Sequence, residues 1–192
     1  MDTSIVLALH AWTTAQPVLA TSVALLAEAG IVVLPILLVV VWLRAASIGP
    51  GTREAVLSGC IGAVIAFAIG YGLEHLLSRP RPFLELGFTP LFPHAADSSF
   101  PSDHTLVGAA LVGPLLWRVQ RLGVLAFFWA LLVGAARVAA GVHYPTDIIG
   151  SAILALAIDA VLWLTIRPVL VRLSPLRLDA GARGKPRRAP RR

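Results

Sequence analysis

The strongest constraint on this chain is a series of apolar stretches long enough to cross a lipid bilayer as helices. A helix needs about 20 mainly apolar residues to span the hydrocarbon core. Five stretches approach or exceed that length: Val18–Leu43, Ala55–Leu77, Thr105–Trp117, Leu122–Ala140 and Ile148–Ile166. The third is the shortest, and it gains length if its helix begins at Ser102. The chain is therefore predicted to be all-α, a polytopic transmembrane bundle of five or six helices.

The choice between five and six helices depends on the N-terminal part of the chain. The first apolar stretch contains residues that could divide it into two helices, namely Pro17, Glu28, Gly30 and Pro35. Residues 1–16 precede this stretch and are predicted to form an interfacial helix or a short extra element.

Composition indicates that lipid surrounds most of the chain. Charged residues make up 14% of the 192 residues and hydrophobic residues 57%, whereas soluble domains carry about a quarter charged residues. We expect one membrane domain over residues 1–173, followed by a basic, disordered cytoplasmic tail over residues 174–192. Cys60 is the only cysteine, which excludes an internal disulfide and a multi-cysteine metal site.

The basic residues predict the orientation of the helices in the membrane. Nine of the sixteen Lys and Arg lie from Arg167 onward, so the net charge of +6 is concentrated at the end of the chain. With five spans and the N-terminus outside, thirteen of the sixteen fall on the cytoplasmic side, as the positive-inside rule expects. The three exceptions are Arg79, Arg81 and Arg137. This pattern predicts a multi-pass protein of the cell membrane, and it favours lipid over nucleic acid as the partner of the basic tail.

Polar residues gather in three clusters that this topology places on the outer side. The clusters are Ser78–Pro82, Phe100–His104, and Arg137 together with Gly141–Asp147. Two histidines, an aspartate and several arginines on one side of so apolar a chain point to a functional site, although each residue alone could be structural.

The residue types in these clusters are typical of a site that binds and attacks phosphate. Arg81 and Arg137 supply planar, charged donors that match phosphate oxygens. Ser102 is expected to cap a helix whose free N–H groups and dipole favour an anion. Asp147 follows His143 by one helical turn, so it could hold one ring nitrogen protonated and leave the other as a nucleophile. His104, at the start of another helix, is then a candidate general acid.

A metal site is the main alternative for the two histidines. His104, His143 and Asp147 could form a His-His-carboxylate triad. The arginines argue against it, because a fixed positive charge beside a divalent cation is unfavourable. We therefore expect neither a metal nor another cofactor.

These clusters resemble the signature of the phosphatidic acid phosphatase type 2 superfamily, which includes bacterial lipid phosphatases, glucose-6-phosphatase and vanadium haloperoxidases. The family pattern is Lys, six residues, Arg-Pro; then Pro-Ser-Gly-His; then Ser-Arg, five residues, His, three residues, Asp. The chain matches it at Arg81-Pro82, at Pro101-Ser102 and His104, and at Arg137, His143 and Asp147.

The resemblance implies a membrane lipid phosphatase that works without metal through a phosphohistidine. It implies that His143 attacks the terminal phosphorus, with Asp147 orienting it. His104 would protonate the leaving oxygen and then activate water. Arg81, Arg137 and Ser102 would hold the phosphoryl oxygens.

The chain departs from the family pattern at three positions. Asp103 replaces the Gly of the second block, Ala136 replaces the Ser before Arg137, and Glu74 stands where the family has Lys. We predict that Glu74 pairs with Arg79 or Arg81 and alters substrate choice. Arg79 is also a candidate replacement for the missing lysine.

Two strings predict the substrate class within the family. Phe-Pro-Ser-Asp-His and Gly-Val-His-Tyr-Pro-Thr-Asp look like the undecaprenyl-diphosphate phosphatase branch. The alternatives are another lipid phosphate, such as phosphatidylglycerophosphate, phosphatidate or a prenyl-phosphoribose phosphate, or a non-catalytic relative that binds phospholipid. Three further histidines match no motif and are predicted to be loop or interface residues: His10, His75 and His94.

Overall fold

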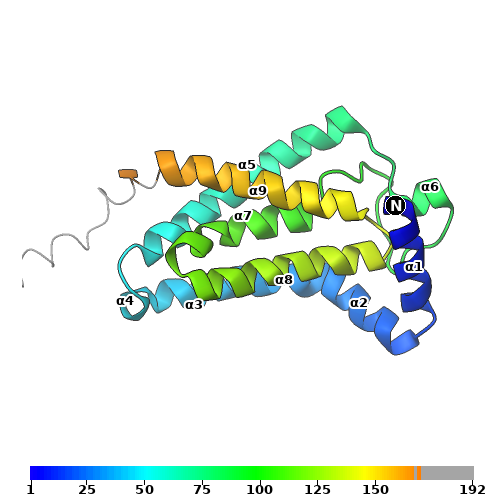
Figure 1. The fold of residues 1–192 in the computed structure, drawn as a ribbon, viewed down its shortest axis with the longest axis horizontal. Coiled ribbons are helices and arrows are strands. Elements are labelled where there is room, and N and C mark those ends of the chain that lie inside the picture. Colours follow the sequence, from blue (N-terminus) through cyan, green and yellow to red (C-terminus); the bar gives the residue numbers. More distant parts are fainter. Residues whose placement is uncertain (167, 170–192) are drawn as a thin grey trace, which may run out of the picture.

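The computed structural model describes residues 1–166, 168 and 169, and all regular elements of this part are helices (Figure 1). In chain order they are α1 (Asp2–Thr14), α2 (Pro17–Ala29), the 3-10 helix η1 (Gly30–Val32), α3 (Val33–Leu43), α4 (Ala45–Ile48), α5 (Thr52–Leu77), α6 (Pro82–Leu86), α7 (Asp103–Arg118), α8 (Gln120–Ala139) and α9 (Pro145–Thr165). The predicted tail, residues 174–192, lies outside the described residues.

Four of these helical stretches are long and apolar enough to cross a membrane. They are Pro17–Leu43, Thr52–Leu86, Gln120–Ala139 and Pro145–Thr165, with mean hydropathies between 2.0 and 2.7. Large apolar side chains such as Val64 and Phe128 are well exposed on them, as expected for helices whose outer surface faces lipid. These features confirm the predicted all-α transmembrane bundle.

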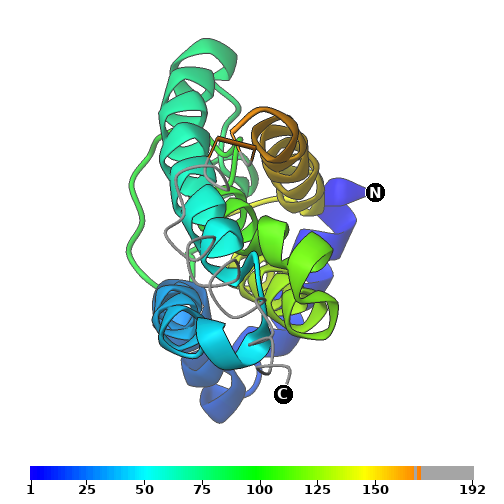
Figure 2. The ribbon, with the colours of Figure 1, turned by 90° about the vertical axis from the view of Figure 1, so that its left-hand side faces the viewer.

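Helix α7, the shortest of the predicted spans, is the central helix of the bundle. It packs against α5, α8 and α9, and the end-on view shows it enclosed by them (Figure 2). Leu106, Ala109 and Val112 are fully buried. Small residues allow its neighbours to approach closely: a Cβ on Gly59 of α5 would lie 2.2 Å from the carbonyl oxygen of Leu111.

The predicted division of the first apolar stretch occurs at η1. This 3-10 segment interrupts the α-helical hydrogen-bond pattern between α2 and α3. Carbonyl groups beside the interruption accept hydrogen bonds from other helices: Ala27 from Arg137 at 3.1 Å, and Gly30 from Trp129 at 2.8 Å. The helix break therefore helps to position Arg137, one of the predicted site residues.

Asp159 of α9 is fully buried where α5, α7 and α9 meet. Glycines on two helices leave room for its carboxyl group: a Cβ on Gly62 would lie 2.5 Å from one oxygen, and a Cβ on Gly113 would lie 2.0 Å from the other. Larger side chains at either glycine would displace this carboxyl group.

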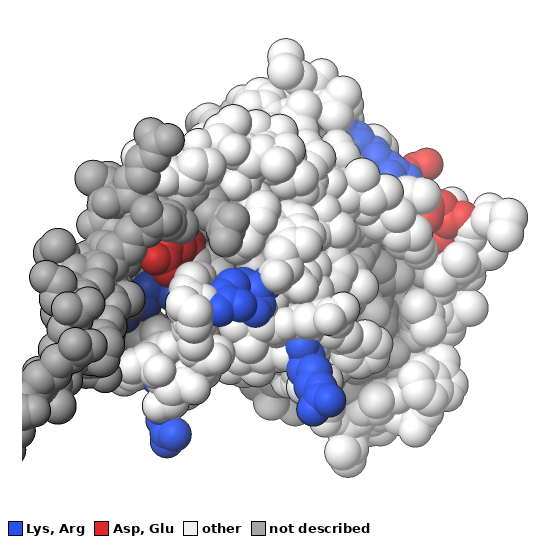
Figure 3. Space-filling model, turned by 60° about the vertical axis from the view of Figure 1, so that its left-hand side comes forward, with Lys and Arg blue, Asp and Glu red and all other residues white. Residues whose placement is uncertain are grey.

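The two ends of the bundle differ in charge. Arg44, Arg53, Arg118 and Arg121 lie where α3, α5, α7 and α8 begin or end on the α4 side. Figure 3 shows basic side chains spread over this end. The opposite end carries α1, α6 and the loops with the predicted site residues (Figure 1).

Candidate active site

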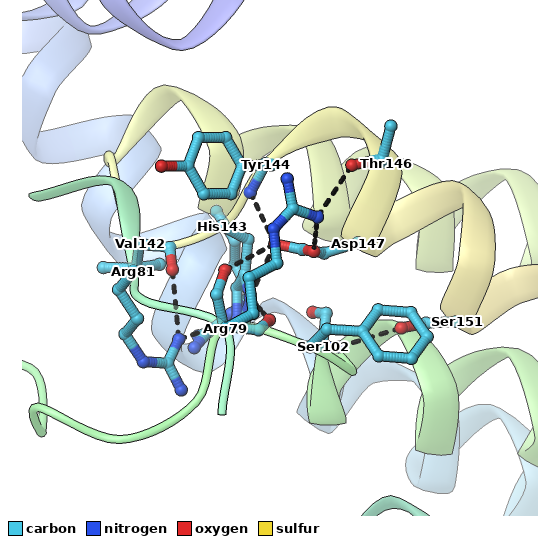
Figure 4. A network of polar contacts seen from close by, with 12 residues as sticks. Arg79, Arg81, Ser102, Val142, His143, Tyr144, Thr146, Asp147 and Ser151 are labelled. Atoms are coloured by element: carbon cyan, nitrogen blue, oxygen red, sulfur yellow. Dashed lines mark hydrogen bonds and ion pairs between the residues drawn. The ribbon is translucent and has the colours of Figure 1, made fainter. Parts of the chain in front are cut away.

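The predicted clusters meet at the end of the bundle opposite α4. Arg79 and Arg81 follow α5, Ser102 precedes α7, and the turn between α8 and α9 carries His143 (Figure 4). Helix α1, predicted to be an interfacial element, lies across the same end and contacts α8 and α9.

His143 is buried, and both of its ring nitrogens have partners. Nδ1 lies 2.8 Å from the carbonyl oxygen of Ser99, and Nε2 lies 3.2 Å from Nη1 of Arg81. A carbonyl only accepts and a guanidinium only donates. His143 is therefore neutral, with its proton on Nδ1 and a lone pair on Nε2, which is the form required of a nucleophile.

The turn that holds His143 has a local explanation. Gly141 has φ of +86° just after α8, in the left-handed region that glycine adopts without a steric penalty. A Cβ at this position would lie 2.3 Å from the ring of Phe88. Pro145 then starts α9 at its first turn, so His143 lies in a short segment fixed at both ends.

The expected direct hydrogen bond from Asp147 to His143 is absent, which corrects the sequence-based interpretation. Oδ2 of Asp147 is 3.9 Å from Nδ1 of His143. It accepts instead from the hydroxyl of Ser99 at 2.5 Å and from the N–H of Tyr144 at 2.8 Å. Asp147 thus holds Ser99, and the carbonyl group of Ser99 holds His143.

We expect Ser99→Ala to lower kcat about tenfold to hundredfold, because the variant loses a hydrogen bond to a buried carboxylate, worth about 1.5–3 kcal/mol. Ser98→Ala is the matched control, since the Ser98 hydroxyl contacts only backbone groups of Arg79 and Phe100. Steady-state phosphate release measures both variants. Equal, small effects in the two would contradict the indirect role of Asp147.

Arg79 holds the N-terminal helix against Asp147. Its guanidinium donates to Oδ1 of Asp147 at 2.5 Å and to Asp2 of α1 at 2.8 Å. It also lies 4.2 Å from the ring centre of Tyr144, a distance that allows a cation–π interaction. The Arg79 side chain therefore links α1, Asp147 and the start of α9, while a third of it stays exposed. Its predicted replacement of the family lysine on phosphate stays a prediction.

The predicted ion pair of Glu74 is not formed, because both candidate arginines have other carboxylate partners. Arg79 pairs with Asp2 and Asp147, and Nε of Arg81 lies 2.6 Å from Oδ1 of Asp97. Glu74 instead lines a pocket of about 350 Å³ that also contains Arg79 and Asp97. Its influence on substrate choice would therefore act through this pocket.

The start of α7 carries the second motif. Ser102 is the N-cap residue, as predicted, but its hydroxyl contacts Thr105 at 3.2 Å and its N–H donates to Ser151. The Ser102 side chain is therefore turned into the bundle. Asp103 and His104 form the first turn and are partly exposed.

Arg137 joins the second and third motifs. Besides its bond to α2, its Nη2 lies 2.8 Å from Nε2 of His94. His104 lies close enough to Arg137 to interact with its positive charge. Sequence reasoning missed His94, along with Asp2, Asp97 and Ser99, because the contacts of these residues join segments far apart in the chain.

The surroundings of His143 predict the pH dependence of catalysis. Burial lowers the pKa of His143 well below its usual value of 6.5, and the positive charges of Arg137 and Arg81 lower it further. If His143 is the nucleophile, as the sequence predicts, the neutral imidazole is the attacking form and persists as the pH falls below 6.5. We expect the acidic limb of kcat/KM to lie below pH 6.5 and to move upward in Arg137→Gln. A wild-type limb above pH 6.5 that follows His143 would contradict this assignment.

The alternative metal triad gains no support from these contacts. Within residues 1–166, 168 and 169, no three His, Cys, Asp or Glu side chains form a metal-binding group. The oxygens of Asp147 are occupied by Arg79, Ser99 and Tyr144. These contacts fit the predicted oxyanion site better than they fit a metal triad.

Comparisons with known proteins agree with this description. The sequence model of the PAP2 superfamily matches residues 55–169, and the chain belongs to this superfamily. Undecaprenyl-diphosphatase BcrC of Bacillus subtilis (strain 168) is 33% identical over 158 residues, which cover 82% of this chain and 80% of BcrC. The predicted family resemblance is thereby confirmed.

Two solved structures share the fold. Aquifex aeolicus LpxE aligns with a TM-score of 0.62 and 23% identity over 80% of this chain and 90% of that chain. A transmembrane PAP2-type phosphatidylglycerolphosphate phosphatase from Bacillus subtilis aligns with a TM-score of 0.58 and 22% identity over 96% and 87% of the two chains. The chain is a membrane-spanning lipid phosphatase of the PAP2 superfamily.

Proposed function

We propose that this enzyme hydrolyses a polyprenyl diphosphate, undecaprenyl diphosphate, to the monophosphate and inorganic phosphate. The observation that carries the proposal is the state of His143, whose Nε2 lone pair lies beside a buried arginine while its Nδ1 proton is held by Ser99. The similarity to an undecaprenyl-diphosphatase over most of the chain supports the choice of substrate.

In the first step, Nε2 of His143 attacks the terminal phosphorus. The bond between phosphorus and the bridging oxygen breaks, and His104 donates a proton to the leaving oxygen. Arg81 and Arg137 stabilise the charge that develops on the phosphoryl oxygens. The products of this step are the prenyl monophosphate and a phosphohistidine.

In the second step, water replaces His143 on phosphorus. His104, now neutral, takes a proton from the water as its oxygen attacks. The bond between phosphorus and Nε2 breaks, inorganic phosphate leaves, and His143 returns to its neutral form. Asp147 keeps the imidazole oriented throughout by holding Ser99.

The charge distribution supports an active site on the extracytoplasmic face. Four arginines, Arg44, Arg53, Arg118 and Arg121, lie at the α4 end, where Figure 3 shows separate basic patches, and the positive-inside rule places such an end in the cytoplasm. The membrane domain of residues 1–173 would then carry out the chemistry outside, while the basic tail of residues 174–192 lies inside. The partners on this proposal are the bilayer and a lipid phosphate.

A substrate panel tests the proposal. We expect purified protein in detergent to release phosphate from undecaprenyl diphosphate with a kcat/KM well above that for phosphatidylglycerophosphate or phosphatidate. A preference for either phospholipid would mean that this phospholipid is the substrate, while the proposed two-step phosphatase chemistry would still apply. Release from none of them would favour the non-catalytic, lipid-binding alternative.

A further inference from the structure

His94 is a third histidine at the site, although it belongs to no family motif. It lies in the loop between α6 and α7 and is partly buried. Its Nε2 is 2.8 Å from Nη2 of Arg137, and its ring meets that of His143 edge-on with 6.3 Å between ring centres. A histidine placed this close to a nucleophile and a phosphate-binding arginine lies within reach of a bound substrate.

The contacts of His94 leave it able to donate a hydrogen bond. Because Arg137 only donates, Nε2 of His94 accepts, and the proton lies on Nδ1. That Nδ1 has a long contact of 3.3 Å to the carbonyl oxygen of Ala95. Burial and the positive charge of Arg81 lower the pKa of His94. His94 is therefore neutral, and its Nδ1–H can donate to a phosphate bound between the arginines while Nε2 keeps its contact with Arg137.

The position of His94 relative to the other histidines identifies the part of the substrate that it meets. Arg81 contacts Nε2 of His143, the attacking atom, and His94 contacts Arg137. His104 lies close enough to both Arg137 and His94 to interact with them electrostatically. His104 is the proposed donor to the leaving oxygen. A substrate whose leaving group approaches His104 would therefore bring that group toward His94 as well.

This location matters only for one class of substrate. When a diphosphate is cleaved, the leaving group is a phosphate that carries charged oxygens. When a lipid monophosphate is cleaved, the leaving group is an alcohol without them. We propose that His94 is a specificity-determining residue that binds the phosphate remaining on the lipid, and so favours diphosphates over monophosphates. This inference rests on the proposed function.

The competing explanation is that His94 only supports the guanidinium of Arg137. Because Arg137 would hold the transferred phosphoryl group of every substrate, loss of such support would slow all substrates equally. The ratio of kcat/KM between a diphosphate and a monophosphate therefore distinguishes the two roles. His94→Gln keeps an acceptor for Arg137 and a donor for phosphate, and should retain much of the ratio.

The test compares wild type, His94→Ala, His94→Gln and the control His75→Ala on undecaprenyl diphosphate and phosphatidate. His75 is exposed on α5 and contacts Tyr71, and it has no contact with Arg137 or His143 among those of the described residues. We expect His94→Ala to lower kcat/KM for the diphosphate about tenfold more than for phosphatidate. Equal losses on both substrates, or no loss, would overturn the proposal. A wild type that prefers phosphatidate would instead overturn the proposed function.

Inhibition by the two products provides a second readout if phosphatidate is not cleaved. Undecaprenyl monophosphate should inhibit His94→Ala about tenfold less strongly than wild type. Inhibition by inorganic phosphate, which fits the position of the transferred group, should not change. A parallel change for both inhibitors would assign His94 to the support of Arg137 alone.

Discussion

Replacement of His143 by alanine is expected to lower phosphate release by at least about three orders of magnitude, the scale seen when a covalent nucleophile is removed. The reason is that Nε2 of His143 is the one unprotonated ring nitrogen held beside Arg81, which would stabilise the attacked phosphoryl group. Steady-state release from undecaprenyl diphosphate, normalised to folded protein, measures the loss.

Because His143 is buried, the alanine variant could also lose stability. His143→Gln is a second variant of similar size whose amide can still bond the Ser99 carbonyl and Arg81. We expect it to unfold near the wild-type temperature and to be as inactive as His143→Ala. Activity of His143→Gln within tenfold of wild type would contradict a histidine nucleophile.

Arg81→Lys is expected to lower kcat about 10²–10³-fold, the range found when one donor to a developing oxyanion is removed. Arg81 is 3% exposed and bonds three groups at once: Asp97, the carbonyl group of Val142, and His143. Lysine keeps the charge but lacks the planar fork that reaches all three. The decrease in kcat should therefore be large even though the positive charge is kept.

Arg121→Lys is the control for Arg81→Lys, since Arg121 is exposed at the opposite end of the bundle. Phosphate release under saturating substrate should be unchanged in this variant. A decrease in kcat below threefold in Arg81→Lys would show that a positive charge at this position suffices. It would contradict the proposal that Arg81 positions the phosphoryl group through its planar guanidinium.

The spans could be predicted because hydropathy is a local property of the sequence. The last four predicted apolar stretches each correspond to one long helix, and the first is divided into α2 and α3 at Gly30, one of the predicted interruption points. The central place of α7 was less evident, because its length alone falls short of a full span. What distinguishes α7 is its packing against helices that lie both before and after it in the chain.

The motif residues were also predictable, but their contacts were not. Three motifs at one end of the bundle follow from topology, whereas the link from Asp147 through Ser99 to His143 depends on the path of the loop between α6 and α7. Neither periodicity nor spacing encodes that path. The same loop supplies His94, which contacts Arg137, and Asp97, which forms an ion pair with Arg81.

The N-terminal helix illustrates the same limit of local patterns. Asp2 bonds Arg79 and Thr146, and His10 lies 3.1 Å from the carbonyl oxygen of Ala139 while its ring stacks on Phe88. These contacts fasten α1 over the site. The sequence indicated an interfacial element there, but it gave no indication that Asp2 shares Arg79 with Asp147.

The central claim, a metal-independent phosphohistidine on His143, is tested most directly by trapping the intermediate. Protein in excess EDTA is mixed with undecaprenyl diphosphate labelled in its terminal phosphate and quenched in alkali, in which phosphohistidine persists. Wild type should carry label, His143→Ala should carry none, and His104→Ala should carry more. The increase is expected because a phosphate leaves readily without an acid, whereas hydrolysis of the intermediate needs a base. Phosphate release by wild type without labelled protein, or release that EDTA abolishes, would contradict the claim.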